Sequence, residues 1–503
     1  MKIKIKADIN KKGPKISKQI YGHFSEHLGR CIYEGLYVGD NKSIPNKNGM
    51  REDVVNALKE IKVPVLRWPG GCFADTYHWR DGIGKNRKRI VNACWGDVVE
   101  DNSFGTHEYF ELCSQLGCET YINGNMGTGS LQEMCEWIEY MTFDGESPLA
   151  LERAENGRKE PFVIDYFGVG NETWGYGGNM TPQYYGDLYR HYQCFLKNYN
   201  TEHPYKKVCV GPSDFDYRWT EEILEKCYAY PHPEGRHGFM DLLSIHYYVI
   251  PGDWEHKGSA TDFTEEEYYT TIRKAYKMDE ILTRNSEILD KYDKNNDIMF
   301  AVDEWGCWLD VEEGTNPGFL YQQSTMRDAI VAALTLNIFN KHADKIIMAN
   351  IAQTVNVLQS VILTDGEKMV KTPTYYVFKM YKEHQNNTLI GSYITSDIIK
   401  SDNDENKQFP QLIESASTDE NGTIYSTITN TSSVKSAKIK CQIADTRVDS
   451  IYAEIISGEC HDKNDFENLD KVKTVEFIDY KKLKDGFTAV IPACSVVKFV
   501  VNK

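Results

Sequence analysis

Two glutamates, Glu172 and Glu304, end closely similar stretches of the chain. Glu172 ends the run Tyr166-Phe-Gly-Val-Gly-Asn-Glu, and Glu304 ends the run Met299-Phe-Ala-Val-Asp-Glu. Each run is short and apolar, which is typical of a buried strand, and a glycine follows each glutamate within a few residues. Two carboxyl groups delivered by two strand ends can form the catalytic pair of a glycosidase. One such glutamate alone would more simply end a strand, but two in the same setting predict a catalytic pair.

The elements that would position this pair alternate along most of the chain. Eight apolar runs of strand length end in glycine or polar residues, at 20–27, 63–71, 119–127, 166–172, 207–214, 242–248, 299–306 and 346–353. Segments with helical periodicity occur at 51–61, 106–116, 131–143, 182–199, 220–230, 264–292, 322–342 and 374–384. This alternation predicts an α/β fold, a (β/α)8 TIM barrel with its functional side chains at the C-terminal strand ends. A doubly wound open sheet would need a nucleotide-binding glycine pattern, and the sequence contains neither G-x-G-x-x-G nor Walker A.

The pattern changes after about residue 388. Helical periodicity stops, and β-rich runs at 423–429, 437–444, 448–456 and 486–501 alternate with clusters of Asn, Asp, Gly and Ser. These runs predict a C-terminal antiparallel β-sandwich, jelly-roll-like in character. The acidic stretch 401–406 is expected to be an exposed loop.

The domain division follows from these two patterns. We expect a catalytic barrel over 16–387 and a β-sandwich over 388–503. Residues 1–15 alternate charged and apolar side chains and precede the barrel without a helical partner. We therefore expect them to form a strand that joins the distant sandwich.

Composition limits the partners and the compartment. A net charge of −17 argues against nucleic acid or an anionic membrane surface as partner. The sequence has no run of 18 apolar residues and no secretory apolar region near its start, so we expect neither a membrane span nor a signal peptide. The thirteen cysteines are scattered and form no C-x-x-C pair, which favours reduced thiols over a disulfide framework or a zinc site. We therefore expect a cytoplasmic protein.

Six short motifs surround the two glutamates. They are Gly22-His-Phe24-Ser-Glu26-His, Arg67-Trp-Pro-Gly-Gly-Cys72-Phe, Gly170-Asn171-Glu172-Thr-Trp174-Gly, His246-Tyr-Tyr248, Asp303-Glu304-Trp-Gly and Asn350-Ile-Ala-Gln353-Thr-Val-Asn. In these motifs the chain resembles the retaining α-L-arabinofuranosidases of glycoside hydrolase family 51. The resemblance extends to the terminal Pro492-Ala-Cys-Ser-Val-Val, so it covers nearly the whole chain. It implies that Glu172, on strand four, is the acid/base and that Glu304, on strand seven, is the nucleophile.

The resemblance also implies a substrate-binding set and support for the nucleophile. The substrate-binding set is Phe24, Glu26, Cys72, Trp95, Asn171, Trp174, His246, Tyr248 and Gln353. Strand alternation places His246 and Tyr248 on one face and Tyr247 on the other. In the family that face points into the site, where the tyrosine hydroxyl contacts the nucleophile. Arg67 is expected to hold Glu304 ionised through a charge-assisted hydrogen bond, with a purely structural ion pair as the alternative.

Other members of the set have alternatives that the sequence leaves open. Asn171, next to the acid/base, is expected to hydrogen-bond the 2-hydroxyl of the sugar. Trp95 and Trp174 are candidates for stacking near the leaving group, although Trp95 suits core packing equally well. Cys72 suits a small buried apolar position as well as a subsite. His246 and Tyr248 would otherwise be polar side chains satisfied within the core.

The function that the resemblance implies is exo-acting, retaining release of terminal α-L-arabinofuranosyl residues (EC 3.2.1.55). The expected substrates are arabinoxylan or arabinan oligosaccharides, and the expected assembly is a homo-oligomer, usually a hexamer in this family. No metal and no other cofactor is expected. The nearest alternative is the same machinery acting on another glycan, as a β-xylosidase or an endo-glucanase.

Two alternatives come from other functional classes. His23, Glu26 and His27 match the H-x-x-E-H pattern of a zinc metallohydrolase, which requires a helix to bring the histidines onto one face. Here the pattern follows a strand-like run and leads into Gly29, so a helix is not expected. A sugar-binding protein without catalysis is the other alternative, but binding alone would need neither Glu172 nor Glu304.

Overall fold

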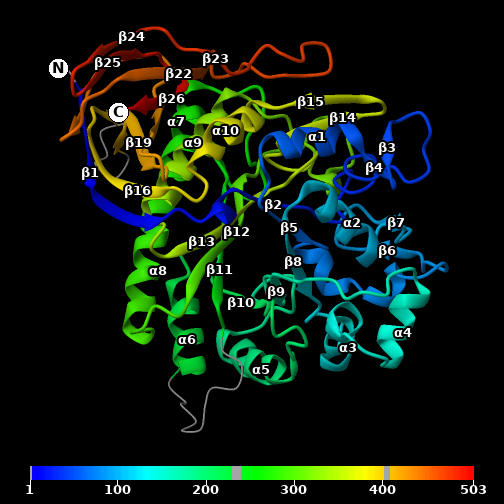
Figure 1. The fold of residues 1–503 in the computed structure, drawn as a ribbon. Coiled ribbons are helices and arrows are strands. Elements are labelled where there is room, and N and C mark those ends of the chain that lie inside the picture. The colour runs from blue at the N-terminus through cyan, green and yellow to red at the C-terminus, as the bar shows by residue number, and fades with distance from the viewer. Residues whose placement is uncertain (1–2, 229–239, 401–407) are drawn as a thin grey trace.

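A closed ring of eight parallel strands forms the centre of the molecule (Figure 1). The computed structural model describes residues 3–228, 240–400 and 408–503. The ring strands are β2 (Gly22–Phe24), β5 (Val65–Trp68), β8 (Glu119–Gly124), β9 (Tyr166–Val169), β10 (Lys206–Cys209), β11 (Leu242–Val249), β12 (Met299–Cys307) and β13 (Ile346–Ala352). They follow one another around the ring in chain order, and β13 pairs with β2 to close it. The predicted (β/α)8 barrel is confirmed.

The inside of the barrel is packed with side chains. One buried layer consists of Val65, Tyr121, Tyr166, Val208, Leu242, Ala301 and Met348. Because these residues lie in the first part or the middle of their strands, they fill the barrel below its C-terminal mouth. Any site with room for a ligand must therefore lie above this layer, where the strands end.

Ten α-helices surround the ring within the described residues. They are α1 (Glu52–Glu60), α2 (Thr106–Leu116), α3 (Leu131–Thr142), α4 (Pro148–Glu155), α5 (Pro182–Phe195), α6 (Tyr217–Tyr228), α7 (Glu265–Tyr276), α8 (Met278–Tyr292), α9 (Met326–Lys341) and α10 (Pro373–Tyr381). All eight predicted helical segments contain helix. The last two residues of the predicted segment 220–230 and the predicted acidic loop 401–406 lie outside the described residues.

Two helices differ from the sequence prediction. The structure adds α4, which is short but has clear start signals: the Ser147 side chain accepts from the Ala150 amide, and Pro148 occupies the first turn. The predicted segment 264–292 divides at Lys277 into α7 and α8. There the Lys277 amide bonds to the Lys274 carbonyl, three residues back instead of four, without any proline or glycine to mark the change.

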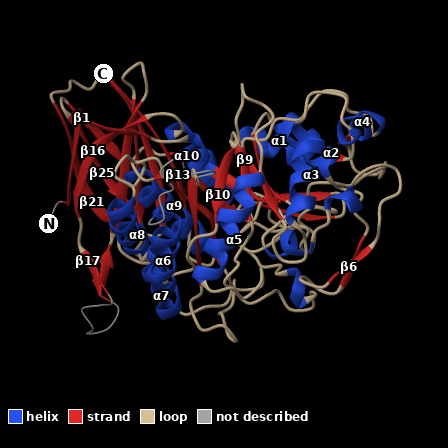
Figure 2. Ribbon diagram, turned by 90° about the horizontal axis from the view of Figure 1, so that it is seen from below, coloured by secondary structure: helices blue, strands red, loops and turns tan. Residues whose placement is uncertain are grey.

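A ten-stranded, mostly antiparallel sheet forms the other end of the molecule (Figure 2). In spatial order its strands are β23 (Val475–Glu476), β22 (Ser450–Ser457), β26 (Ser495–Asn502), β20 (Ile424–Asn430), β19 (Leu412–Thr418), β16 (Thr388–Thr395), β1 (Ile3–Lys15), β21 (Ala437–Ala444), β25 (Gly486–Ile491) and β24 (Tyr480–Leu483). The sheet curls around its own apolar core, which gives the predicted sandwich-like domain. Its first strand in sequence, β1, is antiparallel to β16 and parallel to β21. We propose that the domains divide at 1–15, 16–387 and 388–503.

Short hairpins complete the fold. They are β3 (Asn46–Lys47) with β4 (Met50–Arg51), β6 (Ile90–Asn92) with β7 (Val98–Glu100), β14 (Ile362–Asp365) with β15 (Lys368–Lys371), and β17 (Ile398–Lys400) with β18 (Gln408–Pro410). Within the described residues, no helix combines the length and the apolar character that crossing a bilayer requires.

Helix α9 joins the barrel to the C-terminal sheet. Every residue of α9 except Lys341 is buried, as expected of a helix covered on all sides. Its polar Asn337 faces the sheet: Nδ2 donates to Thr429 Oγ1 at 3.1 Å. The Asn337 Oδ1 accepts from Ser415 Oγ at 2.7 Å and from Thr427 Oγ1 at 2.8 Å. The interface therefore depends on a small buried hydrogen-bond network centred on one amide.

Replacing this amide tests the network. Asn337→Leu should lower the free energy of unfolding by about 1–3 kcal/mol, because it leaves buried hydroxyls without partners. Urea denaturation measures the change. Asn502→Leu is a matched control, because Asn502 is exposed and its side-chain amide nitrogen donates to Ser450 Oγ. This change should alter the free energy of unfolding by no more than about 0.5 kcal/mol. Equal effects of the two changes would mean that the Asn337 network does not stabilise the interface.

Candidate active site

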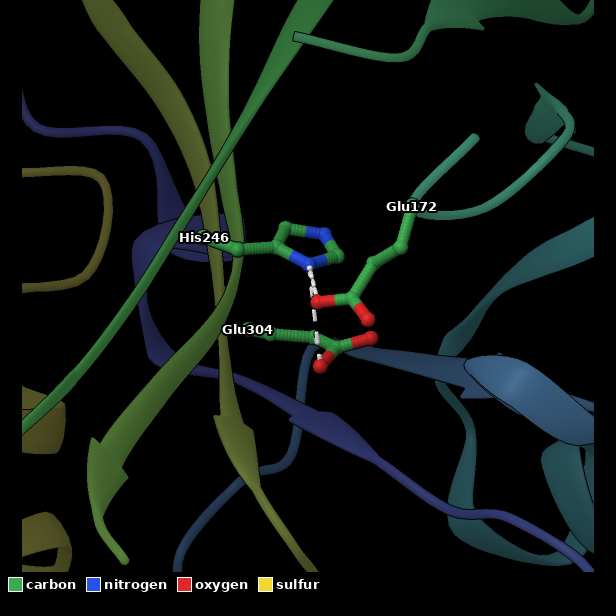
Figure 3. Close-up of side chains that lie close together, drawn as sticks. All are labelled: Glu172, His246 and Glu304. Atoms are coloured by element: carbon green, nitrogen blue, oxygen red, sulfur yellow. Dashed lines mark hydrogen bonds and ion pairs between the residues drawn. The ribbon is translucent and has the colours of Figure 1, made fainter. Parts of the chain in front are cut away.

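Glu172 and Glu304 face each other at the C-terminal mouth of the barrel (Figure 3). Glu172 follows β9, the fourth strand of the ring, and Glu304 lies in β12, the seventh. His246, from β11, lies beside them: its Nδ1 is 2.8 Å from Glu172 Oε1 and 3.6 Å from Glu304 Oε2. One side-chain nitrogen or oxygen of each residue lies within 4.8 Å of those of the other two. The structure thus brings the two predicted carboxyl groups together.

The backbone conformation at Glu172 and the close approach of Gly71 to Glu304 both shape the site. Glu172 has a φ of +40°, in the left-handed region that a non-glycine residue rarely adopts. Gly71, in the loop after β5, passes so close that a Cβ atom there would lie 2.7 Å from Glu304 Oε1. A glycine at this position therefore lets the backbone approach the carboxylate.

A β-bulge in β12 directs the side chains of both Asp303 and Glu304 into the site. Pairing with β11 shifts between Ser244 and His246, where β12 contains one residue more than β11. Such a bulge breaks the alternation of a strand and re-aims side chains. Ala301 points into the barrel, and both Asp303 and Glu304 also contact groups of the barrel mouth. The site therefore contains a third carboxyl group that the sequence analysis did not include.

Asp303 connects the site to the barrel interior. Its Oδ1 lies 3.1 Å from His246 Nε2, and its Oδ2 accepts from Tyr121 Oη at 2.6 Å. His246 therefore bridges Asp303 and Glu172 through its two ring nitrogens. The adjacent acidic pair at a strand end was the signal that could have indicated Asp303, but alternation alone would place it away from Glu304.

Arg67 and Tyr248 hold the Glu304 carboxylate from two sides. Arg67 Nη1 donates to Oε1 at 2.8 Å, and Tyr248 Oη donates to Oε2 at 2.8 Å. As the alternation predicts, His246 and Tyr248 share the inner face of β11, while the Tyr247 hydroxyl donates outward to the Lys274 carbonyl of α7. These two donors hold both oxygens of the Glu304 carboxylate in place.

The pKa values of these groups move in opposite directions. Burial and the charge of Glu304 raise the pKa of Glu172, which favours a protonated carboxyl. Burial lowers the pKa of His246, but the carboxylates of Glu304 and Asp303 outweigh it and raise that pKa to about 10. Burial opposes ionisation of Asp303, yet Arg67 and His246 hold its pKa below the usual range. The site therefore combines one carboxyl whose protonated form is favoured with a charged imidazole and an acid whose ionised form is favoured.

Arg67 also orients Asn171. Its Nη2 donates to Asn171 Oδ1 at 2.6 Å, which fixes the orientation of the amide. Within the described part of the chain, no acceptor bonds to the buried Asn171 Nδ2. This nitrogen is thus a free donor next to Glu172. Phe24 lies beneath the same guanidinium, with its ring centre 4.5 Å from Arg67 Cζ.

Glu26 collects four donors at the side of the site. Its Oε1 accepts from the Gly71 amide at 3.1 Å, the Phe73 amide at 2.9 Å and Trp95 Nε1 at 3.0 Å. Its Oε2 accepts from Gln353 Nε2 at 3.0 Å. Burial raises the pKa of Glu26 to about 7, because it outweighs these hydrogen bonds. The contact with Glu26 shows that Trp95 belongs to the site and is more than a packing residue.

Among the described residues, His23, Glu26 and His27 do not bring three ligand atoms together, so the zinc alternative has no site here. Residues 22–24 form a strand instead of the helix that the zinc pattern requires. The His23 ring packs 4.8 Å from the ring of Phe378, and burial lowers its pKa to about 3. His27 accepts from Trp68 Nε1 at 3.0 Å, and its ring stacks on that of Phe73 with centroids 4.8 Å apart. The three side chains do not share a face because the segment is extended.

Glu172, His246 and Glu304 are themselves types of residue that bind metals. Among the described residues they are the one group of three such side chains whose ligand atoms lie within 4.8 Å. A dication there would have to compete with Arg67 for Glu304 and displace the proton from a His246 held charged by Asp303. The donor set therefore fits proton transfer and nucleophilic attack better than it fits a metal ion.

A cavity of about 470 Å³ opens in front of Glu172. Its walls include Cys72, Trp95, Trp174 and Tyr248, all predicted as binding residues. Cys72 Sγ lies 3.9 Å from Glu172 Oε2, and burial raises the pKa of this thiol, so it stays neutral beside the carboxyl. A larger cavity of about 560 Å³ lies between α2 and the segment before β9, and its walls contain neither Glu172 nor Glu304.

Sequence reasoning missed several groups that line the cavity in front of Glu172. They are Cys94, Tyr176, Ser213, Asp214, Ile250, Trp254 and Trp308. Most of them lie in loops after β9, β10, β11 and β12, where no periodicity indicates which way a side chain points. Trp308 had a usable signal, because it follows Glu304 by four residues at the end of a predicted strand.

Comparison with known proteins agrees with this geometry. The model of the family described as "Alpha-L-arabinofuranosidase C-terminal domain" matches residues 303–495, and that of "Alpha-L-arabinofuranosidase 1 domain" matches residues 57–264. An intracellular exo-α-L-arabinofuranosidase of Bacteroides ovatus is 47% identical over 96% of this chain and 92% of its own. The α-L-arabinofuranosidase C of Emericella nidulans is 30% identical over 76% of this chain and 74% of its own.

Solved structures show the same similarity. A family 51 arabinofuranosidase from Xanthomonas axonopodis pv. citri superposes with a TM-score of 0.95 at 42% identity, over 100% of both chains. The α-L-arabinofuranosidase of Thermotoga maritima, solved as an arabinose complex, gives a TM-score of 0.86 at 29% identity, over 99% of both chains. The similarity therefore includes both the barrel and the C-terminal sheet.

The opposing effects of Glu304 and His246 on Glu172 can be separated. Glu304→Gln removes a neighbouring negative charge and should lower the pKa of Glu172. His246→Gln removes the positive partner of the ionised form and should raise that pKa. Carbon-13 NMR of carboxyl-labelled glutamate, assigned with Glu172→Gln, measures both.

Tyr247→Phe serves as the control, because Tyr247 neighbours His246 on β11 but faces α7. It should leave the Glu172 titration unchanged. Shifts of the same sign in Glu304→Gln and His246→Gln would contradict the electrostatic account of the site.

Proposed function

Because the chain belongs to the exo-acting α-L-arabinofuranosidases of glycoside hydrolase family 51, we propose a retaining double displacement with Glu304 as nucleophile and Glu172 as acid/base. The observation that carries this proposal is the close approach of the two carboxyl groups, whose oxygens come within 4.8 Å. Retaining glycosidases separate their carboxyl groups by about 5–5.5 Å, whereas inverting enzymes need about 6.5–9.5 Å for a water molecule. The contacts of each glutamate support the same division of roles.

In the first step, Glu304 attacks the anomeric carbon of a terminal arabinofuranosyl residue. The bond to the leaving-group oxygen breaks as Glu172 transfers its proton to that oxygen. Arg67 and Tyr248 hold the attacking carboxylate in place. The raised pKa of Glu172 favours the protonated carboxyl that donates this proton.

In the second step, water replaces the Glu304 ester. Forming that ester removes the negative charge of Glu304, which is one cause of the raised pKa of Glu172. The pKa of Glu172 therefore falls, and the ionised carboxylate accepts a proton from water. His246, charged and bonded to Glu172, favours this ionised form. Attack by the activated water releases arabinose with its original anomeric configuration and restores Glu304.

Groups around Asn171 and Glu26 form the proposed arabinose subsite. Asn171 Nδ2 is a free donor beside Glu172 and suits the 2-hydroxyl of the sugar. Glu26 and Gln353, which are hydrogen-bonded to each other, present further polar atoms. Phe24 and Cys72 contribute apolar surface around the arabinose ring, and Trp95 and Trp174 are proposed to stack near the leaving group.

The proposed substrates are short arabinoxylan or arabinan oligosaccharides inside the cell. The Bacteroides ovatus relative is named as intracellular, which supports a cytoplasmic location for this chain. We also propose a homo-oligomer, a hexamer by family resemblance. Light scattering of the purified protein measures the assembly, and a monomeric mass would contradict it.

The two glutamates should fail in different ways. Glu304→Ala should lower kcat by about a thousandfold or more for every leaving group, and azide should restore turnover as a product of inverted configuration. Glu172→Ala should still be glycosylated by nitrophenyl arabinofuranosides, because nitrophenolate leaves without a proton. Its arabinosyl ester on Glu304 should then accumulate, and azide should release a product of retained configuration.

Mass spectrometry of Glu172→Ala mixed with the aryl substrate detects the ester and its position. Glu420→Ala, at an exposed turn of the C-terminal sheet, is the control and should behave like the unmodified enzyme. An ester on any residue other than Glu304, or exchanged stereochemistry between the two variants, would show that the roles are assigned wrongly.

A further inference from the structure

Trp254 lies at the outer part of the cavity in front of Glu172 and takes no part in the proposed chemistry. It belongs to the loop between β11 and α7 and is 63% exposed. A single exposed aromatic residue is ordinary and does not by itself define a site. Its meaning depends on how the loop holds it and on what it borders.

The loop that carries Trp254 is a closed and anchored turn. The Gly252 amide bonds to the Lys257 carbonyl at 3.1 Å, which closes the turn. Asp253 Oδ1 accepts from two backbone amides within the turn, at 3.0 and 2.8 Å. Asp310, in the segment after β12, accepts from the backbone amide of Lys257 at 3.0 Å. The hydrogen bonds within the turn and to Asp310 therefore fix where Trp254 is presented.

A line of aromatic rings connects Trp254 to the catalytic centre. Its ring packs edge-on against Trp308, with centroids 5.0 Å apart, and Trp308 packs against Tyr248 at 5.2 Å. Tyr248 in turn donates to Glu304. Lys257 Nζ lies 4.6 Å from the centre of the Trp254 ring. The ring is thus supported by Trp308 and Lys257 while most of the residue remains open.

Aromatic and polar side chains together line the cavity that contains Glu172 and Trp254. Ser213 and Asp214, after β10, supply polar groups to this lining. The Asp214 amide bonds to the His246 carbonyl at 2.9 Å, which ties these polar groups to the catalytic strand β11. A sugar presents C–H groups on one face and hydroxyl groups around its edge, so it can stack on one side and hydrogen-bond on the other.

We propose that Trp254 is the stacking platform for the second sugar of the leaving group, counted outward from the cleaved bond. This inference rests on the proposed function, because the role of Glu172 as proton donor defines the side of the site on which the leaving group lies. The ligand is the neutral pentose chain of the substrates proposed above. The enzyme then prefers leaving groups of two or more sugars over a single sugar.

The test compares substrates that differ only beyond the first sugar of the leaving group. Hydrolysis of 1,5-linked arabinobiose releases a one-sugar leaving group, and arabinotriose releases a two-sugar leaving group. The ratio of kcat/KM for the triose to kcat/KM for the biose should exceed one in the unmodified enzyme. It should fall about fivefold or more in Trp254→Ala, the size expected for one lost stacking contact.

Two further variants make the result specific. Trp254→Phe keeps an aromatic ring and should keep most of the preference for the triose. Tyr393→Ala removes an aromatic residue of similar exposure, 66%, from β16 of the C-terminal sheet, and it should leave the ratio unchanged. Circular dichroism and thermal unfolding show whether each variant is folded.

Each outcome has one meaning. A ratio that does not exceed one in the unmodified enzyme, or that Trp254→Ala leaves unchanged, overturns the proposal. An equal loss for the biose and the triose also overturns it, because Trp254 would then only shape the cavity. Failure of the unmodified enzyme to cleave aryl arabinofuranosides would instead overturn the proposed function itself, so the two ideas fail separately.

Discussion

The buried guanidinium of Arg67 is the interaction on which the site depends. Only 1% of its side chain is exposed, so burying its charge would cost several kcal/mol without anionic partners. It lies 2.8 Å from Glu304 and 3.6 Å from Asp303, and its remaining nitrogen holds Asn171. One fixed cation thus holds the carboxylate of the proposed nucleophile, balances the charge of Asp303 and orients Asn171. The high pKa of His246 depends on the same two carboxylates.

The barrel strands bring the side chains of the site to one end of the barrel. Local departures from regular backbone geometry then direct the reacting groups toward one another. Regular strands would have turned Asp303 away from Glu304, but the extra residue in β12 brings both into the mouth. Gly71 allows the backbone to touch the carboxylate, and Glu172 adopts a rare backbone conformation. Such features occur where the surrounding fold is stable enough to impose them.

The sequence predicted those features of the structure that follow from hydrophobic periodicity and strand alternation. The eight strands and the shared face of His246 and Tyr248 followed from apolar runs and from alternation. Asp303 was missed because a bulge breaks alternation, and Trp254 was missed because loops have no period. The strand-like run before His23 already argued against the zinc pattern, and the structure has a strand at residues 22–24. Glu26 and Gln353 were identified from the resemblance to a known family. Their side chains are in contact although the two residues lie 327 positions apart in the sequence.

The place of β1 within the C-terminal sheet constrains how the chain assembles. Strand β1 leaves the ribosome before β16 and β21, the two strands between which it lies, and neither of these exists until the barrel sequence has been synthesised. At about 5–20 residues per second, that wait lasts roughly twenty seconds to more than a minute. During it, an amphipathic strand with Ile3, Ile5 and Ala7 on one side has an unpaired edge. Its alternating lysines keep that waiting edge charged and resistant to pairing with other nascent chains.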